Sequence, residues 1–197
     1  MSTAVLGSSD VVSAAVASSL GTAVQQHDAS LPPGLNGVVI VTGSHARLTP
    51  LTAIDGFEWH QLAEQPMRQT LAALQHSHLS MSGQGGRIVL ILPTIGISGA
   101  ADLVPYTTAM EGIRAMAKSA ARQWAPGGVV INMIAVPAGL LAPTLSAATS
   151  HLTAAAVSDA HGIIETVVET TEFLLRHEVT HLVGATIVAD GGSVMSP

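Results

Sequence analysis

The chain has 197 residues, of which 48% are apolar and only 10% are charged. A chain of this length and apolar content buries roughly 70% of its unfolded surface, which excludes an intrinsically disordered protein. Its formal net charge of -6 argues against nucleic acid as a partner, because phosphate binding needs a basic face. The lack of cysteine excludes a disulfide framework, a thiol nucleophile and a thiolate metal site.

The mean hydropathy of +0.48 is high for a chain that is not a membrane protein. Every stretch of about 18 residues, the length that a spanning helix needs, is interrupted by glycine, proline or polar residues. The opening residues, MSTAVLGSSD, carry no positive charge, so we expect no secretory signal and a cytoplasmic location. A chain this apolar with so few charges is expected to cover part of its surface with a protein partner.

Short apolar runs alternate with helical patterns along the chain, which is typical of βαβ units and a parallel sheet. Strands are predicted at Ala4–Leu6, Val38–Thr42, Arg87–Leu92, Val129–Ala135 and Ala185–Val188. Helices are predicted at about 10–20, 58–81, 105–124 and 159–176. Continuous apolar strands need helices on both faces of the sheet. We therefore expect an α/β fold, a three-layer Rossmann-like doubly wound parallel sheet, in a single domain over residues 1–197.

The segment 21–37 is too short to hold a complete unit of such a sheet. It separates the first predicted helix from the strand at 38–42 and contains Pro32-Pro33-Gly34. A complete crossover unit takes about 30 residues or more, so only a stub strand at 22–24 fits there. The first half of the sheet is therefore predicted to be abbreviated.

Two segments resemble the short-chain dehydrogenase/reductase family. GGRIVLILPTIGISGAADLVPYTTAMEGIRAMAKSAARQWAPGGVVINMIA (85–135) is similar to the family's serine strand, tyrosine helix and following strand. THLVGATIVADGG (180–192) is similar to its final strand and Asp-Gly-Gly turn. The resemblance extends more weakly to the front of the chain and implies a deletion between about 21 and 37. It also implies the fold of an NAD(P)-dependent oxidoreductase.

The catalytic residues that this resemblance implies are mostly replaced. In the family a tyrosine is the general acid/base, and a lysine four residues later lowers its pKa. Tyr106 matches the tyrosine, but Met110 stands at the lysine position and Pro93 at the serine position. Lys118 lies too far along the same helix, about 18 Å away at 1.5 Å per residue. Because an unassisted phenol with a pKa of about 10 is a poor base at neutral pH, we interpret Tyr106 as vestigial, with its ring packed on the sheet.

The same comparison predicts poor cofactor binding. Family members hold a nicotinamide dinucleotide at a glycine-rich first turn, with the pyrophosphate at a helix N-terminus. Gly7 aligns with the first glycine, whereas Val11 and Ser13 occupy the other two positions, and Asp10 adds a negative charge. Gly43 is the remnant of a second family motif. We therefore expect no cofactor on this chain.

The segment His177-Glu178-Val179-Thr180-His181 satisfies the HExxH pattern of zinc proteases. That chemistry needs both histidines on one helix face, together with a third ligand. Val183-Gly184 and a β-rich run follow closely, so His181 is expected beyond the last helical turn. We do not predict a metal site.

The leading hypothesis is a noncatalytic, SDR-like subunit that associates with a catalytically complete short-chain dehydrogenase, which carries NAD or NADP. It would stabilise that partner or shape its substrate pocket, without a nucleic acid or membrane as partner. The resemblance implies contact through the helices near 58–81 and 105–124 and through residues 163–188. Small residues suggest close helix packing there: Ala72, Ala73, Ala109, Gly112, Ala115, Ala117, Ala120 and Ala121.

Two alternatives remain open. One is a diverged NAD(P)-dependent oxidoreductase that uses Tyr106 on an alcohol or ketone substrate, with acyl-thioesters included. The other is a homo-oligomeric small-molecule-binding protein that uses a cleft between residues 93–99 and Tyr106.

Overall fold

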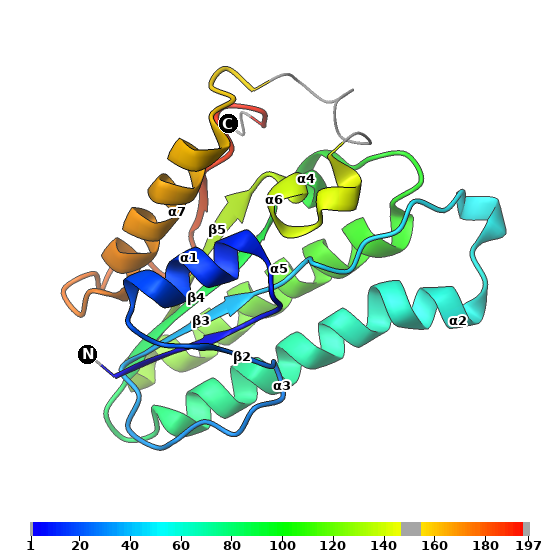
Figure 1. Ribbon diagram of the computed structural model, residues 1–197. Coiled ribbons are helices and arrows are strands. Elements are labelled where there is room, and N and C mark those ends of the chain that lie inside the picture. Colours follow the sequence, from blue (N-terminus) through cyan, green and yellow to red (C-terminus); the bar gives the residue numbers. More distant parts are fainter. Residues whose placement is uncertain (1, 147–154, 195–197) are drawn as a thin grey trace.

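The computed structural model describes residues 2–146 and 155–194 (Figure 1). Within these residues six strands form one parallel sheet in the order β2-β1-β3-β4-β5-β6. The strands are β1 (Thr3–Leu6), β2 (Val24–Gln25), β3 (Gly37–Val41), β4 (Gly86–Pro93), β5 (Val129–Val136) and β6 (Thr186–Val188). The predicted α/β parallel sheet is therefore confirmed.

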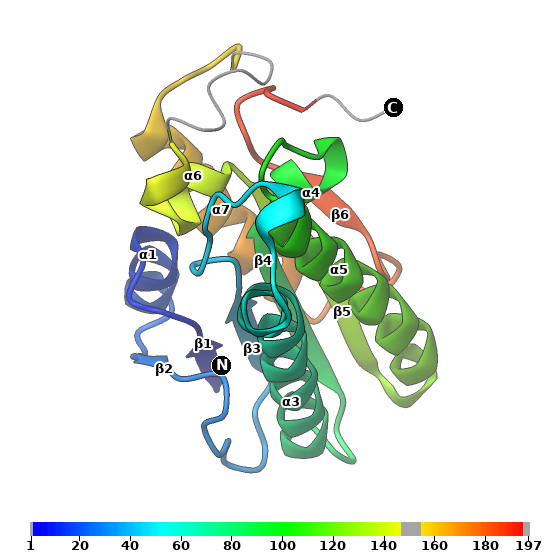
Figure 2. The same ribbon diagram turned by 90° about the vertical axis from the view of Figure 1, so that its right-hand side faces the viewer.

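Helices cover both faces of this sheet (Figures 1 and 2). One face carries α1 (Val11–Ser19) and α7 (Ala160–Leu175), and the other carries α3 (Gln65–Ser80) and α5 (Val104–Trp124). Shorter pieces are α2 (Gly56–Trp59), the π-helical stretch His60–Glu64, α4 (Ile95–Ser98) and α6 (Ala138–Leu141), with 3-10 turns at Leu51–Ala53, Ala125–Gly127 and Pro143–Leu145. Among the described residues, no helix has both the length and the apolar character required to cross a bilayer.

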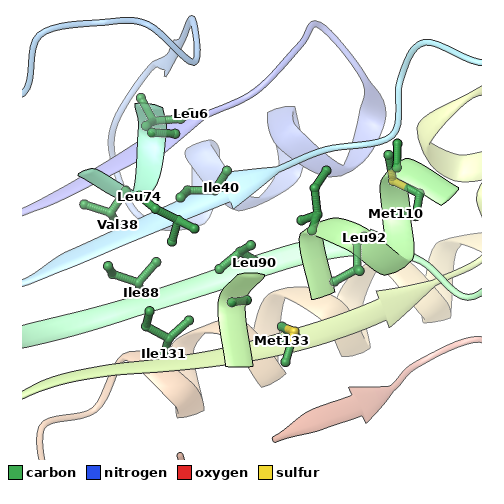
Figure 3. Packing of buried hydrophobic residues seen from close by; sticks show 14 of the residues in the cluster. Leu6, Val38, Ile40, Leu74, Ile88, Leu90, Leu92, Met110, Ile131 and Met133 are labelled. Carbon is green, nitrogen blue, oxygen red and sulfur yellow. The ribbon is translucent and has the colours of Figure 1, made fainter. Parts of the chain in front are cut away.

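The central strands contribute alternate residues to two cores, because successive side chains of a strand point to opposite faces. Ile88 and Leu90 of β4 pack with Leu74 of α3 on one side. Val89 and Ile91 belong to the core under α1 and α7. Figure 3 shows the first of these cores. Residues 87–93 of β4 are thus all buried, which explains the apolar run over residues 88–92.

The parallel register brings the carboxyl ends of the strands to one edge of the sheet. Leu6 pairs with Ile40, and Val41 pairs with Ile91. The chain turns from β1 to β2 on one side, whereas β3 lies on the other side of β1. A topological switch point therefore lies between the carboxyl ends of β1 and β3, the position at which open α/β sheets bind ligands.

The front of the sheet is short, as predicted. Residues 26–36, all of them described, connect β2 with β3 and contain no helix or strand. The predicted stub strand was misplaced, because β2 covers residues 24 and 25 rather than 22–24. The helix predicted at 58–81 begins at Gly56 and changes to π-helical hydrogen bonding before α3.

Arg87 in β4 ties the sheet to the end of α7. Its side chain is buried, and its Nε donates to the carbonyl of Arg176 at 3.3 Å. Its Nη2 donates to the carbonyl of His177, and its Nη1 to that of Gly86 at 3.1 Å. The last carbonyls of a helix have no partner within the helix, so the guanidinium supplies donors where the chain leaves α7.

Replacing Arg87 with methionine keeps an unbranched side chain but removes these donors. We expect Arg87→Met to lower the free energy of unfolding by about 2–3 kcal/mol, because the hydrogen bonds from a charged guanidinium to these carbonyls are lost. Urea denaturation measures the change. The matched control is Arg122→Met at an exposed position in the last turn of α5, for which we expect a change within about 0.5 kcal/mol. Equal losses in the two variants would contradict this role for Arg87.

Candidate functional site

Tyr106 lies in the first turn of α5 and is completely buried. Its hydroxyl donates a hydrogen bond of 2.7 Å to the backbone carbonyl of Gly43, directly beyond β3. Burial raises the pKa of the Tyr106 phenol above its ordinary value, and no charged neighbour opposes this shift. The expectation that the tyrosine ring packs on the sheet is confirmed.

Gly43 makes this contact possible. Its φ of 105° lies in the region that favours glycine. A Cβ at this position would lie 2.9 Å from both the Tyr106 hydroxyl and Cδ of Pro93. Close packing among these three residues therefore accounts for the glycine.

The family's other catalytic positions supply no assistance to the phenol. Met110 lies one turn beyond Tyr106 and is also completely buried. Thr94, the hydroxyl residue next to Pro93, donates to the carbonyl of Val136 at 3.3 Å. Within the described residues, no lysine or arginine pairs with Tyr106. A general base needs a pKa near the working pH, and this environment shifts the phenol in the opposite direction.

Asp10 organises the turn that follows β1. Its Oδ1 accepts a hydrogen bond of 2.8 Å from the backbone N–H of Ser13, and its Oδ2 accepts one of 2.7 Å from the Ser13 hydroxyl. Ser13 is completely buried, and a Cβ on Gly7 would lie 2.6 Å from the Ser13 hydroxyl. The carboxylate thus caps α1 at the end where a pyrophosphate would need free N–H donors. These residues do not fit a dinucleotide held at this turn.

Two adjoining hollows lie at the switch point between β1 and β3. The inner cavity has a volume of about 50 Å³ and is lined by the polar residues Ser8, His27, Thr42, Ser44 and Gln69, with Met110 at its apolar side. The outer groove has a volume of about 410 Å³ and is lined by Asp10, Val11, Leu140, Leu141 and Pro143. The two hollows adjoin, because both are lined by Ser8, Ser44 and His45.

Sequence reasoning found Tyr106, Met110, Pro93, Gly7 and Gly43 but missed the polar side chains that line the inner cavity. His27 lies in the segment without regular structure between β2 and β3, so no periodic pattern marked it. Thr42 was read as the last residue of a strand. Its position at the carboxyl end of a predicted parallel strand could have marked Thr42 as a residue of a binding site.

The HExxH segment lies outside a helix, because α7 ends at Leu175. His177 pairs through Nδ1 with Glu178 at 3.1 Å, and Nδ1 of His181 is bonded to the Thr180 hydroxyl at 2.8 Å. The expected position of His181 beyond the helix is confirmed. In residues 2–146 and 155–194, no group of three or more histidine and carboxylate side chains is placed to hold a metal ion.

Comparison with known proteins gives matches over nearly all of the chain. A family model described as enoyl-(acyl carrier protein) reductase matches residues 4–194. A short-chain dehydrogenase/reductase of Hericium erinaceus is 27% identical over 164 residues, which cover 79% of this chain and 64% of that protein. A cis-4-hydroxycyclohexanecarboxylate dehydrogenase of Sinomonas cyclohexanicum is 28% identical over 149 residues, which cover 73% of this chain and 59% of that protein. The chain thus spans less than two thirds of the length of these relatives.

A solved structure shares the fold. It is a 3-oxoacyl (acyl-carrier-protein) reductase of Agrobacterium tumefaciens C58 with NADP bound. It superposes with a TM-score of 0.76 at 16% sequence identity, over 97% of this chain and 93% of that chain. At this identity the likeness shows the fold alone.

The chain contains a single tyrosine, so its phenolate absorbance in the near ultraviolet reports on Tyr106 alone. We expect the folded chain to show less than about a tenth of the full phenolate signal one pH unit above the ordinary tyrosine pKa of about 10. The reason is that burial disfavours the charged form. Spectrophotometric titration, with circular dichroism at each pH to confirm folding, measures this.

The same titration in urea is the control and should return the ordinary tyrosine pKa. Ionisation of Tyr106 in the folded chain at or below that value would contradict the buried, carbonyl-bonded state described above.

Proposed function

This chain belongs to the short-chain dehydrogenase/reductase family, and we propose that it acts there as a noncatalytic subunit. In this proposal it associates in the cytoplasm with a catalytically complete short-chain dehydrogenase and stabilises that enzyme or shapes its substrate pocket. The observation that carries the proposal is the buried hydrogen bond between the Tyr106 hydroxyl and the carbonyl of Gly43.

This hydrogen bond occupies the hydroxyl of Tyr106, the one side chain that matches a catalytic residue of the family. The phenol is completely buried, so no substrate reaches it without rearrangement of α5 or of the segment after β3. Its raised pKa keeps it protonated at neutral pH. With Met110 in place of a cation, no group in contact with Tyr106 favours proton removal.

The proposal places the nicotinamide cofactor on the partner rather than on this chain. The carboxylate of Asp10 occupies the N-terminus of α1, and Val11 beside it is 54% exposed at the place where a glycine would let phosphates approach. A negative charge there disfavours a pyrophosphate. The NADP of the solved neighbour illustrates the kind of cofactor, NAD or NADP, that we expect on the partner.

Exposed apolar residues support two association surfaces. The first lies on α2 and α3, where Phe57 and Leu79 are 73% and 68% exposed. The second lies at the edge of the sheet beside α7, where an open groove of about 860 Å³ is lined by Ile163 and Val188. In the described part of the chain, β6 pairs only with β5, so its outer edge offers free backbone donors and acceptors.

The sequence suggested that the small residues of α5 form an interface with a partner subunit. The structure gives this interpretation less support. Ala109, Ala117 and Ala121 are completely buried in this chain's own core. A Cβ on Gly112 would lie 2.8 Å from Sδ of Met67, so Gly112 lets α3 approach α5. These residues serve internal packing, and the proposal therefore rests on the exposed apolar side chains.

The names of the relatives favour one competing function, that of a dehydrogenase. It requires a cofactor on this chain and release of Tyr106 from Gly43. The ligand-binding alternative loses its proposed cleft, because Tyr106 is completely buried and lines no open surface.

Native mass spectrometry of the tagged chain, purified from its own host, tests the proposal. We expect a hetero-oligomer with a complete short-chain dehydrogenase and fewer nicotinamide cofactors than subunits. A homo-oligomer that carries one cofactor per chain would contradict the proposal and favour the dehydrogenase. A homo-oligomer without cofactor would contradict the partner and favour the ligand-binding alternative.

Substitution of the phenol tests the same proposal in the purified complex. We expect Tyr106→Phe to leave the turnover rate within about twofold, because the buried hydroxyl takes no part in proton transfer. The matched control is the equivalent Tyr-to-Phe change in the partner, which should lower the rate by about 100-fold or more. A loss of that size in Tyr106→Phe would show that this chain performs chemistry.

A further inference from the structure

The inner cavity and the outer groove at the switch point have no role in the proposed association. One hydroxyl that lines the inner cavity has no partner among the described residues. It belongs to Thr42, which is only 5% exposed as a residue. Because this hydroxyl can both donate and accept a hydrogen bond, its position points to a molecule with a polar group in the cavity.

Two further polar groups of the inner cavity are neutral, namely the His27 ring and the hydroxyl pair of Ser8 and Ser44. Nε2 of His27 is 2.9 Å from the carbonyl of Val41 and donates to it, which leaves Nδ1 as an acceptor in the neutral ring. Burial lowers the pKa of His27 and so favours this neutral form. The hydroxyls of Ser8 and Ser44 are bonded to each other at 2.8 Å, and one of their two hydrogens remains free to donate.

The charges around the two hollows select against anions. Neither hollow is lined by lysine or arginine. The carboxylate of Asp10 lines the outer groove and is already satisfied by Ser13. A phosphate in this site would therefore meet the Asp10 carboxylate without a lysine or arginine to offset it, whereas an uncharged ligand would not be penalised.

The outer groove adds an apolar surface to this polar end. Leu140, Leu141 and Pro143 line it on the side of α6. Its volume of about 410 Å³ lies within the usual range for small-molecule sites, which runs from about 300 to 1,000 Å³. We propose that the inner cavity and the outer groove together bind an uncharged molecule with a hydroxylated head and a short apolar chain. The head lies against Thr42 and His27, and the chain lies along the groove.

The probe for the test is 1,2-hexanediol, titrated into the complete chain and followed by NMR. The signals to follow are the His27 ring and the methyl group of Met110, which lines the inner cavity. We expect saturable shifts of both signals with a dissociation constant of about 1–10 mM. Hexyl phosphate has the same chain with an anionic head and should bind at least about tenfold more weakly, because the Asp10 carboxylate repels it and no lysine or arginine lines the site.

The variant Thr42→Val keeps the side-chain shape and removes the hydroxyl. We expect it to weaken diol binding by about two- to tenfold, the usual effect of one lost hydrogen bond. Thr166→Val, at an exposed position on α7, is the matched control and should leave diol binding unchanged. Circular dichroism confirms that both variants fold.

Three results would overturn the inference. These are a lack of saturation up to about 100 mM diol, equal binding to Thr42→Val and the parent chain, or tighter binding of hexyl phosphate. None of these three results would contradict the proposed role as a noncatalytic subunit. Displacement of the diol by NADP, in contrast, would overturn both this inference and the placement of the cofactor on the partner.

Discussion

The hydrogen bond from Tyr106 to the carbonyl of Gly43 joins the start of α5 to the end of β3 and fixes the centre of this molecule. It depends on the positive φ of Gly43 and on the contact with Pro93 that the missing Cβ allows. A carbonyl buried at this place needs a donor, and the phenol is the group that supplies it. The Tyr106 hydroxyl is therefore held inside the core of this structure.

The same principle governs the turn after β1. Asp10 accepts hydrogen bonds from the N–H and the hydroxyl of Ser13, so a carboxylate already occupies this end of α1. The residues that specify the fold are therefore different from those that make a catalytic site. The sheet is specified by apolar runs that fill two cores, whereas a catalytic site depends on a few polar residues, which change without loss of the sheet.

The sequence was sufficient for elements whose pattern is local. Residues 88–92 of β4 are all apolar because both faces of the strand are buried there, and Met110 and Pro93 were found from their spacing to Tyr106. Contacts between distant segments left no such pattern. Arg87 reaches carbonyls of Arg176 and His177, about ninety residues away, and His27 joins the inner cavity through the irregular segment 26–36. Small residues in α5 were assigned to a partner, although a helix that packs closely within its own chain needs the same residues.

The open outer edge of β6 has a consequence for how such a chain is produced. An unpaired edge strand is a template for any other free strand, and proteins normally protect it. Here the groove beside the same edge is lined by the apolar side chains of Ile163 and Val188. In a hetero-oligomer, a subunit synthesised in excess of its partner would aggregate through this edge, so the cell has to match the dosage of the two chains and bring them together soon after synthesis.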